Sequence, residues 1–153
     1  FQDMVEDVGE HLTRVDQRGA LASAVAAGGV HLLGTSGTVT TLAGLQLGLK
    51  RYDRKQVDGT WLTSRQIDEM TAELLAMSYE ARVENPCIGP GRADLVLAGC
   101  AILEAIRIRW PCERLRVADR GLREGMLMEL IERDRLNKRR SRRRPMRRRP
   151  VHA

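Results

Sequence analysis

Residues 30–43 read VHLLGTSGTVTTLA, and this stretch decides the fold of the chain. Residues 30–33 form a short apolar run that stops at a glycine, which is typical of a buried strand. From Val39 onward, apolar residues follow at a spacing compatible with a helix. The turn between the two contains only glycine, serine and threonine. The sequence therefore predicts a strand, a tight turn and a helix, in that order.

The same pattern recurs nearer the other end of the chain. Residues 115–118 form a second short apolar run, which the turn Asp119-Arg120-Gly121 and a further helical pattern follow. Between the two patterns, residues 63–66 form a capping box at the start of a helix, and residues 52–62 hold a short strand or a loop. Residues 95–108 are apolar almost all round, which predicts a helix buried on most sides, and the small residues 98–101 allow another backbone to approach closely. Strands that alternate with helices indicate an α/β layered domain whose sheet has a parallel component.

Composition limits the class of protein. The chain has 153 residues, enough for one domain with a real core, and only five aromatic residues, so the core must be aliphatic. No apolar run is long enough to cross a membrane, and the first twenty residues do not resemble a signal peptide. Three cysteines without C-x-x-C spacing favour reduced thiols in the cytoplasm over a disulfide framework or a metal site.

The charge is divided unevenly along the chain. Ten of the 26 Lys and Arg residues lie within residues 135–153, where no acid occurs, so the remainder has 16 basic and 20 acidic residues and a net charge of −4. We expect residues 1–135 to form the domain and residues 136–153 to form a disordered basic tail. The tail residues that could bind a polyanion are Lys138, Arg139, Arg140, Arg142, Arg143, Arg144, Arg147, Arg148 and Arg149.

Three junctions carry candidate site residues. Glycine, hydroxyl groups and free N–H groups at a helix start suit an anion, which makes the first turn a candidate phosphate site: Gly34, Thr35, Ser36, Gly37 and Thr38. Taken alone, such a turn is more often an ordinary capped helix start. Arg92 and Arg123, each near a helix start, are candidate phosphate ligands, with Asp94, Asp119 and Glu124 in support. The competing interpretation of the last junction is a surface salt-bridge cluster.

Recognisable hydrolase motifs are missing. The sequence has no H-E-x-x-H, no G-x-S-x-G and no P-loop, and no pair of carboxylates is convincingly placed to hold Mg²⁺ and a water. The three histidines are not at ligand spacing, and the sequence predicts no metal ligand in this chain.

Taken together and in order, these segments resemble the exopolyphosphatase and guanosine-pentaphosphate phosphohydrolase (Ppx/GppA) family. Residues 34–43 resemble its G-T-G/S-G-T-x-T-T-L-A segment, and residues 52–62 resemble its Y-D…V-x-G…L stretch. Residues 91–99 look like its R-A-D-x-I-x-x-G helix opening, and residues 118–125 are similar to its S-D-x-G-L-R-E-G signature. The resemblance covers roughly residues 1–135. It implies the second domain of an actin-like, RNase-H-like (ASKHA) fold, with helices on a small mixed sheet.

The resemblance also implies a function. Family members hydrolyse the terminal phosphoanhydride of inorganic polyphosphate or of guanosine pentaphosphate, usually with Mg²⁺. Their phosphate loops and catalytic glutamate belong to an N-terminal half that this chain lacks. We therefore expect the substrate-side half of such an enzyme, without a catalytic residue or bound cofactor of its own, inactive alone, and partnered by the missing domain and the substrate.

Two other classes of function stay open. The chain could be a binding module for RNA or other polyanions that works through the basic tail, or a non-catalytic scaffold of the ASKHA type. The sequence predicts no membrane partner and does not decide whether the protein forms a homodimer.

Overall fold

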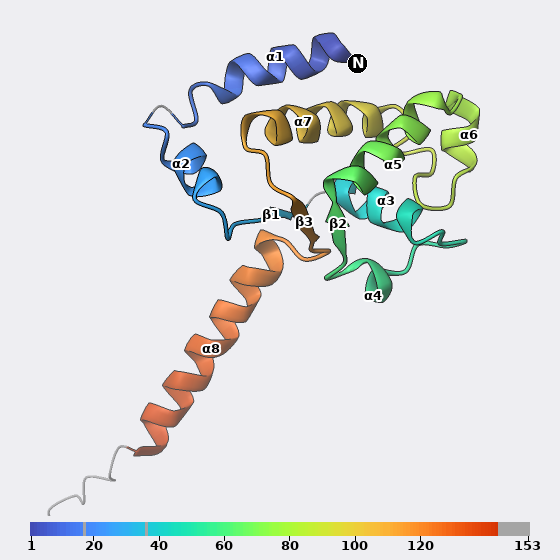
Figure 1. Cartoon of the computed structure of the whole chain (residues 1–153). Helices are drawn as coiled ribbons and strands as arrows, with labels where there is room; N and C mark the ends of the chain where they lie inside the picture. Colours follow the sequence, from blue (N-terminus) through green and yellow to red (C-terminus); the bar gives the residue numbers. More distant parts are fainter. Residues whose placement is uncertain (17, 36, 144–153) are drawn as a thin grey trace, which may run out of the picture. The chain divides into compact units, whose positions relative to one another are not determined.

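The computed structural model describes residues 1–16, 18–35 and 37–143, in two compact units. The first unit spans Phe1–Asp119, and the second begins at Arg120 and contains one helix, α8 (Leu122–Arg143). The elements of the first unit, drawn in Figure 1, are α1 (Gln2–Leu12), α2 (Ala20–Ala26), β1 (Leu32–Gly34), α3 (Gly37–Gln46), α4 (Arg54–Val57), β2 (Trp61–Thr63), α5 (Ser64–Ala76), α6 (Tyr79–Glu84), α7 (Leu95–Arg109) and β3 (Arg114–Val117).

The sheet has three strands in the order β1-β3-β2. β1 pairs with β3 in parallel, with Gly34 opposite Val117, while β2 pairs with β3 antiparallel, with Trp61 opposite Arg116. The expected mixed sheet with a parallel component is thus confirmed. Residues 52–62, expected to hold a strand or a loop, contain both the short helix α4 and the edge strand β2.

Helices cover one face of this sheet and form the core with it. Leu115 of β3 and Leu62 of β2 are fully buried, together with Leu42 of α3 and Leu74 of α5. The largest fully buried side chains are aliphatic apart from Thr41 and Cys100, as the scarcity of aromatic residues requires. Burying such side chains is the main favourable contribution to folding.

The small-residue segment of α7 does allow a close approach. A Cβ atom added at Gly99 would lie 2.0 Å from Oγ1 of Thr38, so the start of α3 can touch the backbone of α7 only because residue 99 is glycine. On another side, α1 lies along α7 and buries Val5 against Ala101 and Ala105 (Figure 1).

The prediction that α7 is buried on most sides was wrong for three of its apolar residues. Leu95, Ile102 and Ile108 are 68%, 48% and 64% exposed. Apolar composition shows that a helix can be buried, but the available neighbours decide how much of it is.

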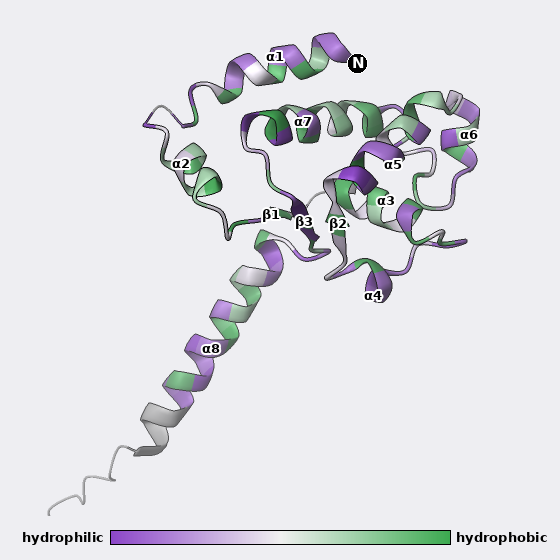
Figure 2. Cartoon of the chain, in the orientation of Figure 1, coloured by the Kyte–Doolittle hydropathy of each residue, from purple (hydrophilic) through white to green (hydrophobic). Residues whose placement is uncertain are grey.

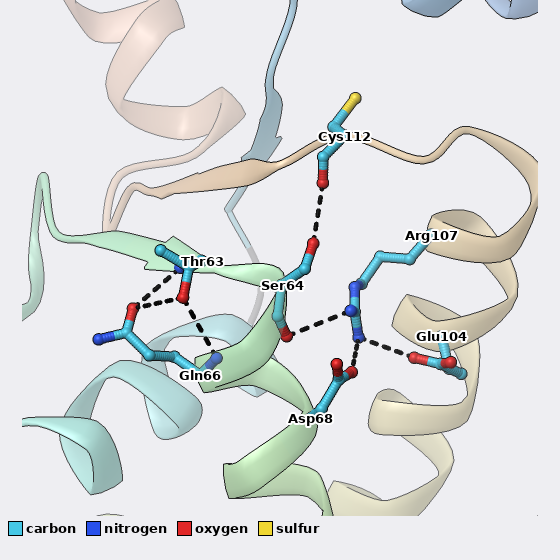
Figure 3. Close-up of polar contacts among 7 residues, drawn as sticks. All are labelled: Thr63, Ser64, Gln66, Asp68, Glu104, Arg107 and Cys112. Atoms are coloured by element: carbon cyan, nitrogen blue, oxygen red, sulfur yellow. Dashed lines mark hydrogen bonds and ion pairs between the residues drawn. The ribbon is translucent and has the colours of Figure 1, made fainter.

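A polar cluster ties the start of α5 to the end of α7 (Figure 3). The predicted capping box is present, since Thr63 accepts from the backbone N–H of Gln66 and the Gln66 side chain accepts from the N–H of Thr63. Beside it, the mostly buried guanidinium of Arg107 contacts Asp68 at 2.7 Å and Glu104 at 2.8 Å, and also donates to the Ser64 carbonyl at 3.2 Å. With its donors occupied in this way, Arg107 has a structural role.

The second unit is a single helix that continues into the expected tail. α8 runs to Arg143, so residues 136–143 are helical where we expected disorder, while residues 144–153 lie outside the described residues. Arg and Lys are good helix formers, and pairs such as Lys138–Asp134 at 2.7 Å support the last described turns. The pair of Glu129 and Arg133 at i,i+4 is also present, at 3.7 Å. Green and purple segments alternate along the coloured part of α8 in Figure 2, because apolar and polar residues alternate in its sequence, and its large apolar side chains are exposed.

Two expectations from composition concern the described residues. Among them, no helix is long and apolar enough to cross a membrane. Cys87, Cys100 and Cys112 are all free and buried, and burial raises the pKa of Cys100 to about 11, so this thiol is a poor nucleophile at neutral pH.

Candidate anion-binding site

The strands that precede the two junctions singled out in the sequence, β1 and β3, end at one edge of the sheet. Because β1 and β3 are parallel, their carboxyl ends lie together. The N–H of Ala118 donates to the carbonyl of Gly34 at 2.8 Å, which joins the two turns directly. In open α/β sheets, ligands bind outside the carboxyl ends of the strands, so this edge is the place to look for a site.

Arg92 brings the third junction to the same edge. A Cβ atom added at Gly37 would lie 3.5 Å from Cζ of Arg92 and 3.6 Å from its Nη1, so the guanidinium covers the first residue of α3. Gly37, Thr38 and Arg92 line a hollow of about 160 Å³ together with Thr41, Leu95 and Val96. This site, called the α3 hollow below, thus combines the free N–H groups of a helix start with a guanidinium.

The guanidinium of Arg92 is available for a ligand. It is exposed and has no hydrogen bond or ion pair to another described residue. Its backbone is nevertheless held in place: the N–H of Arg92 donates to Gly89 at 3.2 Å, and the guanidinium of Arg82 donates to the carbonyls of Ala93 at 3.0 Å and Met77 at 2.8 Å. A fixed backbone with an unpaired charged head suits anion recognition.

A second network fixes the other turn. Asp119, at the end of β3, pairs with Arg54 of α4 at 3.0 Å, and its N–H donates to Asp58 at 2.9 Å. The hydroxyl of Tyr52 contacts the side chains of Asp119 and Thr40. Burial, followed by the hydrogen bond to Asp119, raises the pKa of Tyr52, so the phenol stays protonated at neutral pH and can donate to that carboxylate. Tyr52 therefore connects α3 to the residue that follows β3, and Arg54 pairs with the same carboxylate.

The other predicted site residues of the first and third junctions do not all line the α3 hollow. Thr35 is exposed, and Ser36 lies outside the described residues. The side chain of Thr38 packs against Gly99 of α7. Asp94 is exposed at the N-cap of α7, where its side chain makes no capping hydrogen bond.

At the last junction, for which a surface salt-bridge cluster is the alternative interpretation, the predicted site residues have the following contacts. The ion pair of Asp119 is with Arg54, from a distant part of the sequence. Glu124 accepts from the N–H of Gly121 at 2.9 Å and so caps the start of α8. Arg123 is exposed in the first turn of α8, within the second unit. The predicted tail residues Lys138, Arg139, Arg140, Arg142 and Arg143 lie at the end of this helix, and Arg144, Arg147, Arg148 and Arg149 lie outside the described residues.

Sequence reasoning missed the residues that hold this site in place. Tyr52 was noted only as part of a motif, and Arg54 and Arg82 were not considered. Each makes its contacts with residues 5 to 67 positions away in the chain. Only the Tyr-Asp dipeptide at residues 52–53 was a usable signal.

The fold, with helices on a small mixed sheet, is the actin-like (ASKHA) architecture. The family model for the "Ppx/GppA phosphatase family" matches residues 2–134. The chain therefore belongs to the Ppx/GppA phosphatase family.

Individual relatives agree with this assignment. "Exopolyphosphatase 2" of Mycobacterium tuberculosis is 26% identical over 102 residues, which cover 64% of this chain and 32% of that protein. A solved Ppx/GppA phosphatase from Aquifex aeolicus, the type II variant, is 29% identical with a TM-score of 0.67, over 82% of this chain and 39% of that one. A solved "exopolyphosphatase-like protein" is 27% identical with a TM-score of 0.74, over 86% and 42%. The chain thus spans about a third of the length of the curated relative and about two fifths of the solved structures.

Proposed function

We propose that this chain is the substrate-side half of a phosphoanhydride hydrolase that acts on inorganic polyphosphate or guanosine pentaphosphate. The observation that carries the proposal is the guanidinium of Arg92, unpaired among the described residues, over the first turn of α3. Membership of a phosphatase family and the exopolyphosphatase name of a relative support the same class of substrate.

In this proposal the chain binds and orients phosphate groups. The guanidinium of Arg92 donates to phosphate oxygens, and the helix start offers backbone N–H groups to the same anion. Arg123 is proposed as a further phosphate ligand. Tyr52, Arg54 and Asp119 hold the edge of the site in position and do not touch the substrate.

Catalysis is assigned to the rest of a longer protein. Mg²⁺ would neutralise phosphate charge there. Among the described residues of this chain, no three His, Cys, Asp or Glu side chains are grouped to hold a metal ion. We therefore expect the 153-residue chain to release no phosphate from polyphosphate by itself. Turnover at the rate of a full-length relative would refute this.

The test of the proposal is Arg92→Ala in the longer protein, with Arg65→Ala as the control. A charge-assisted hydrogen bond contributes about 1.5–3 kcal/mol, so KM for substrate should rise roughly ten- to a hundredfold while Tm stays unchanged. Arg65 is exposed, and its one ion pair among the described residues is with its helix neighbour Glu69, at 3.4 Å, so its removal should change neither quantity. A large loss of Tm with normal KM in Arg92→Ala would show a structural role instead.

A second proposed function rests on the basic end of the chain. Ten Lys or Arg residues and no acid occur within residues 135–153. Such a segment binds phosphate-rich polymers without sequence preference and with strong salt dependence. RNA or polyphosphate could be held by it in addition to the α3 hollow.

A further inference from the structure

The face of the sheet away from the helices carries an unusual group of side chains. Register places Leu33, Arg116 and Trp61 side by side across the three strands, with Arg114 and Thr63 in the next row. This outer face, defined by these five residues, is open: Leu33 is 63% and Trp61 36% exposed. β3 is deep purple in Figure 2, because arginine occupies both of its outward positions.

Trp61 holds the two arginines in place. Cζ of Arg114 lies 4.8 Å from the centroid of the indole ring, and Cζ of Arg116 lies 4.9 Å from it. His31 meets the same ring edge-on, with 4.7 Å between centroids. Stacking of a guanidinium on a ring uses its flat face and leaves its N–H donors free. The indole ring thus orders two cationic heads without neutralising them.

No carboxylate among the described residues neutralises this pair. Neither Arg114 nor Arg116 has an ion pair with a described carboxylate, and the five residues of the outer face include no Asp or Glu. Gly59, with φ +84°, makes room for one of them: a Cβ atom there would lie 3.1 Å from Nη2 of Arg116. Two guanidinium groups, ordered by the indole ring and without an ion pair to a described carboxylate, thus lie two residues apart on one strand.

We propose that the outer face is a second binding site for a chain of phosphate groups, with inorganic polyphosphate as its ligand. The choice follows from the indole ring. Two guanidinium groups and an imidazole already contact it, so little of it is left for a nucleobase to stack on. An extended polyphosphate needs no stacking partner and presents one oxyanion after another to arginine donors. This inference rests on the proposed function for its choice of ligand.

The test uses the indole N–H signals of the 153-residue chain in an NMR titration with long-chain polyphosphate. Trp110, whose indole Nε1 donates to Asp16 at 3.3 Å, is the internal reference. Long-chain polyphosphate should shift the Trp61 signal and leave the Trp110 signal in place. Arg114→Ala/Arg116→Ala should abolish the Trp61 shift and weaken binding roughly tenfold at low salt, because two phosphate contacts are lost.

Matched variants make the outcome decisive. Arg65→Ala/Arg109→Ala removes the same charge from exposed helical positions and should retain the Trp61 shift. Arg114→Lys/Arg116→Lys keeps the charge and should give intermediate affinity. An unmoved Trp61 signal, or equal loss of affinity in the helical control, overturns the proposal. Single-stranded RNA that shifts Trp61 at lower concentration than polyphosphate overturns the choice of ligand. Arg92→Ala should leave the Trp61 shift intact, so the two proposals fail separately.

Discussion

The contact between Gly99 of α7 and Thr38 of α3 gives a sharp test of the packing that positions the site. A Cβ atom at residue 99 would lie 2.0 Å from Oγ1, 3.1 Å from Cβ and 3.2 Å from Cγ2 of Thr38. Rotation of the Thr38 side chain cannot relieve all three contacts, because its own Cβ is one of them. Gly99→Ala must therefore move α3 and α7 apart.

The expected magnitude follows from two opposing terms. Overpacking a core typically costs about 1–3 kcal/mol, while replacing glycine by alanine inside a helix stabilises it by about 1 kcal/mol. Gly9→Ala, in α1, isolates the second term, because nothing lies within 4 Å of a Cβ atom at that position. The free energies of unfolding of the two variants should differ by about 1–3 kcal/mol, with Gly99→Ala the less stable.

Urea denaturation measures this difference. With m near 2 kcal/mol/M, a gap of 2 kcal/mol separates the two midpoints by about 1 M urea. Thr38→Ala should recover part of the loss when combined with Gly99→Ala, giving a coupling energy of about 1 kcal/mol or more. If Gly99→Ala stabilises the protein as much as Gly9→Ala does, the close approach of α3 and α7 is wrong. Because Thr38 lines the α3 hollow, Gly99→Ala should also weaken anion binding.

Two further predictions concern pH and salt. Backbone hydrogen bonds, chiefly from Ala22, lower the pKa of Asp16, so its stabilising effect is full above the unfolded pKa of about 3.9 and is lost as pH falls through the lower folded pKa. Thermal melts between about pH 5 and 2 should show less loss of Tm for Asp16→Asn than for the wild type, and parallel curves would contradict this. Truncation after Leu136 in the longer protein should raise KM for long polyphosphate, leave kcat unchanged, and matter less as salt rises. A changed kcat, or an effect that survives high salt, would show a structural role for the tail.

The sequence predicted best what short segments determine by themselves. The turn between β1 and α3, the capping box at Thr63 and Gln66, and the small-residue segment around Gly99 each depend on a few neighbouring residues. These features can be predicted because the residue types themselves determine the backbone conformations and the hydrogen bonds that are possible at each position.

What the sequence did not predict depends on pairing across the fold. Arg54 pairs with Asp119, 65 positions away in the chain. Arg114 and Arg116 are ordered by contact with Trp61 on the neighbouring strand. The neighbouring residues in the sequence do not predict these contacts, because arginines in similar sequence surroundings are often exposed without a specific contact. The exposed apolar residues of α7 were missed for the same reason, since the burial of a residue depends on whether another element packs against it.

Net charge alone gives no sign of the anion sites proposed for this domain. Outside its basic end the chain carries a net charge of −4, yet Arg92 and the pair Arg114 and Arg116 have no carboxylate partner among the described residues. The charge of Asp119 is meanwhile neutralised by Arg54. Asp119 follows β3, whose end lies beside that of β1, and the guanidinium of Arg92 covers the start of α3. The local electrostatic field depends on the positions of the charges that have no partner. A carboxylate that is paired with a cation repels a nearby phosphate less than a free carboxylate does. The net negative charge of the rest of the domain also repels polyanions. A phosphate chain should therefore bind only at the few places where guanidinium groups have no carboxylate partner.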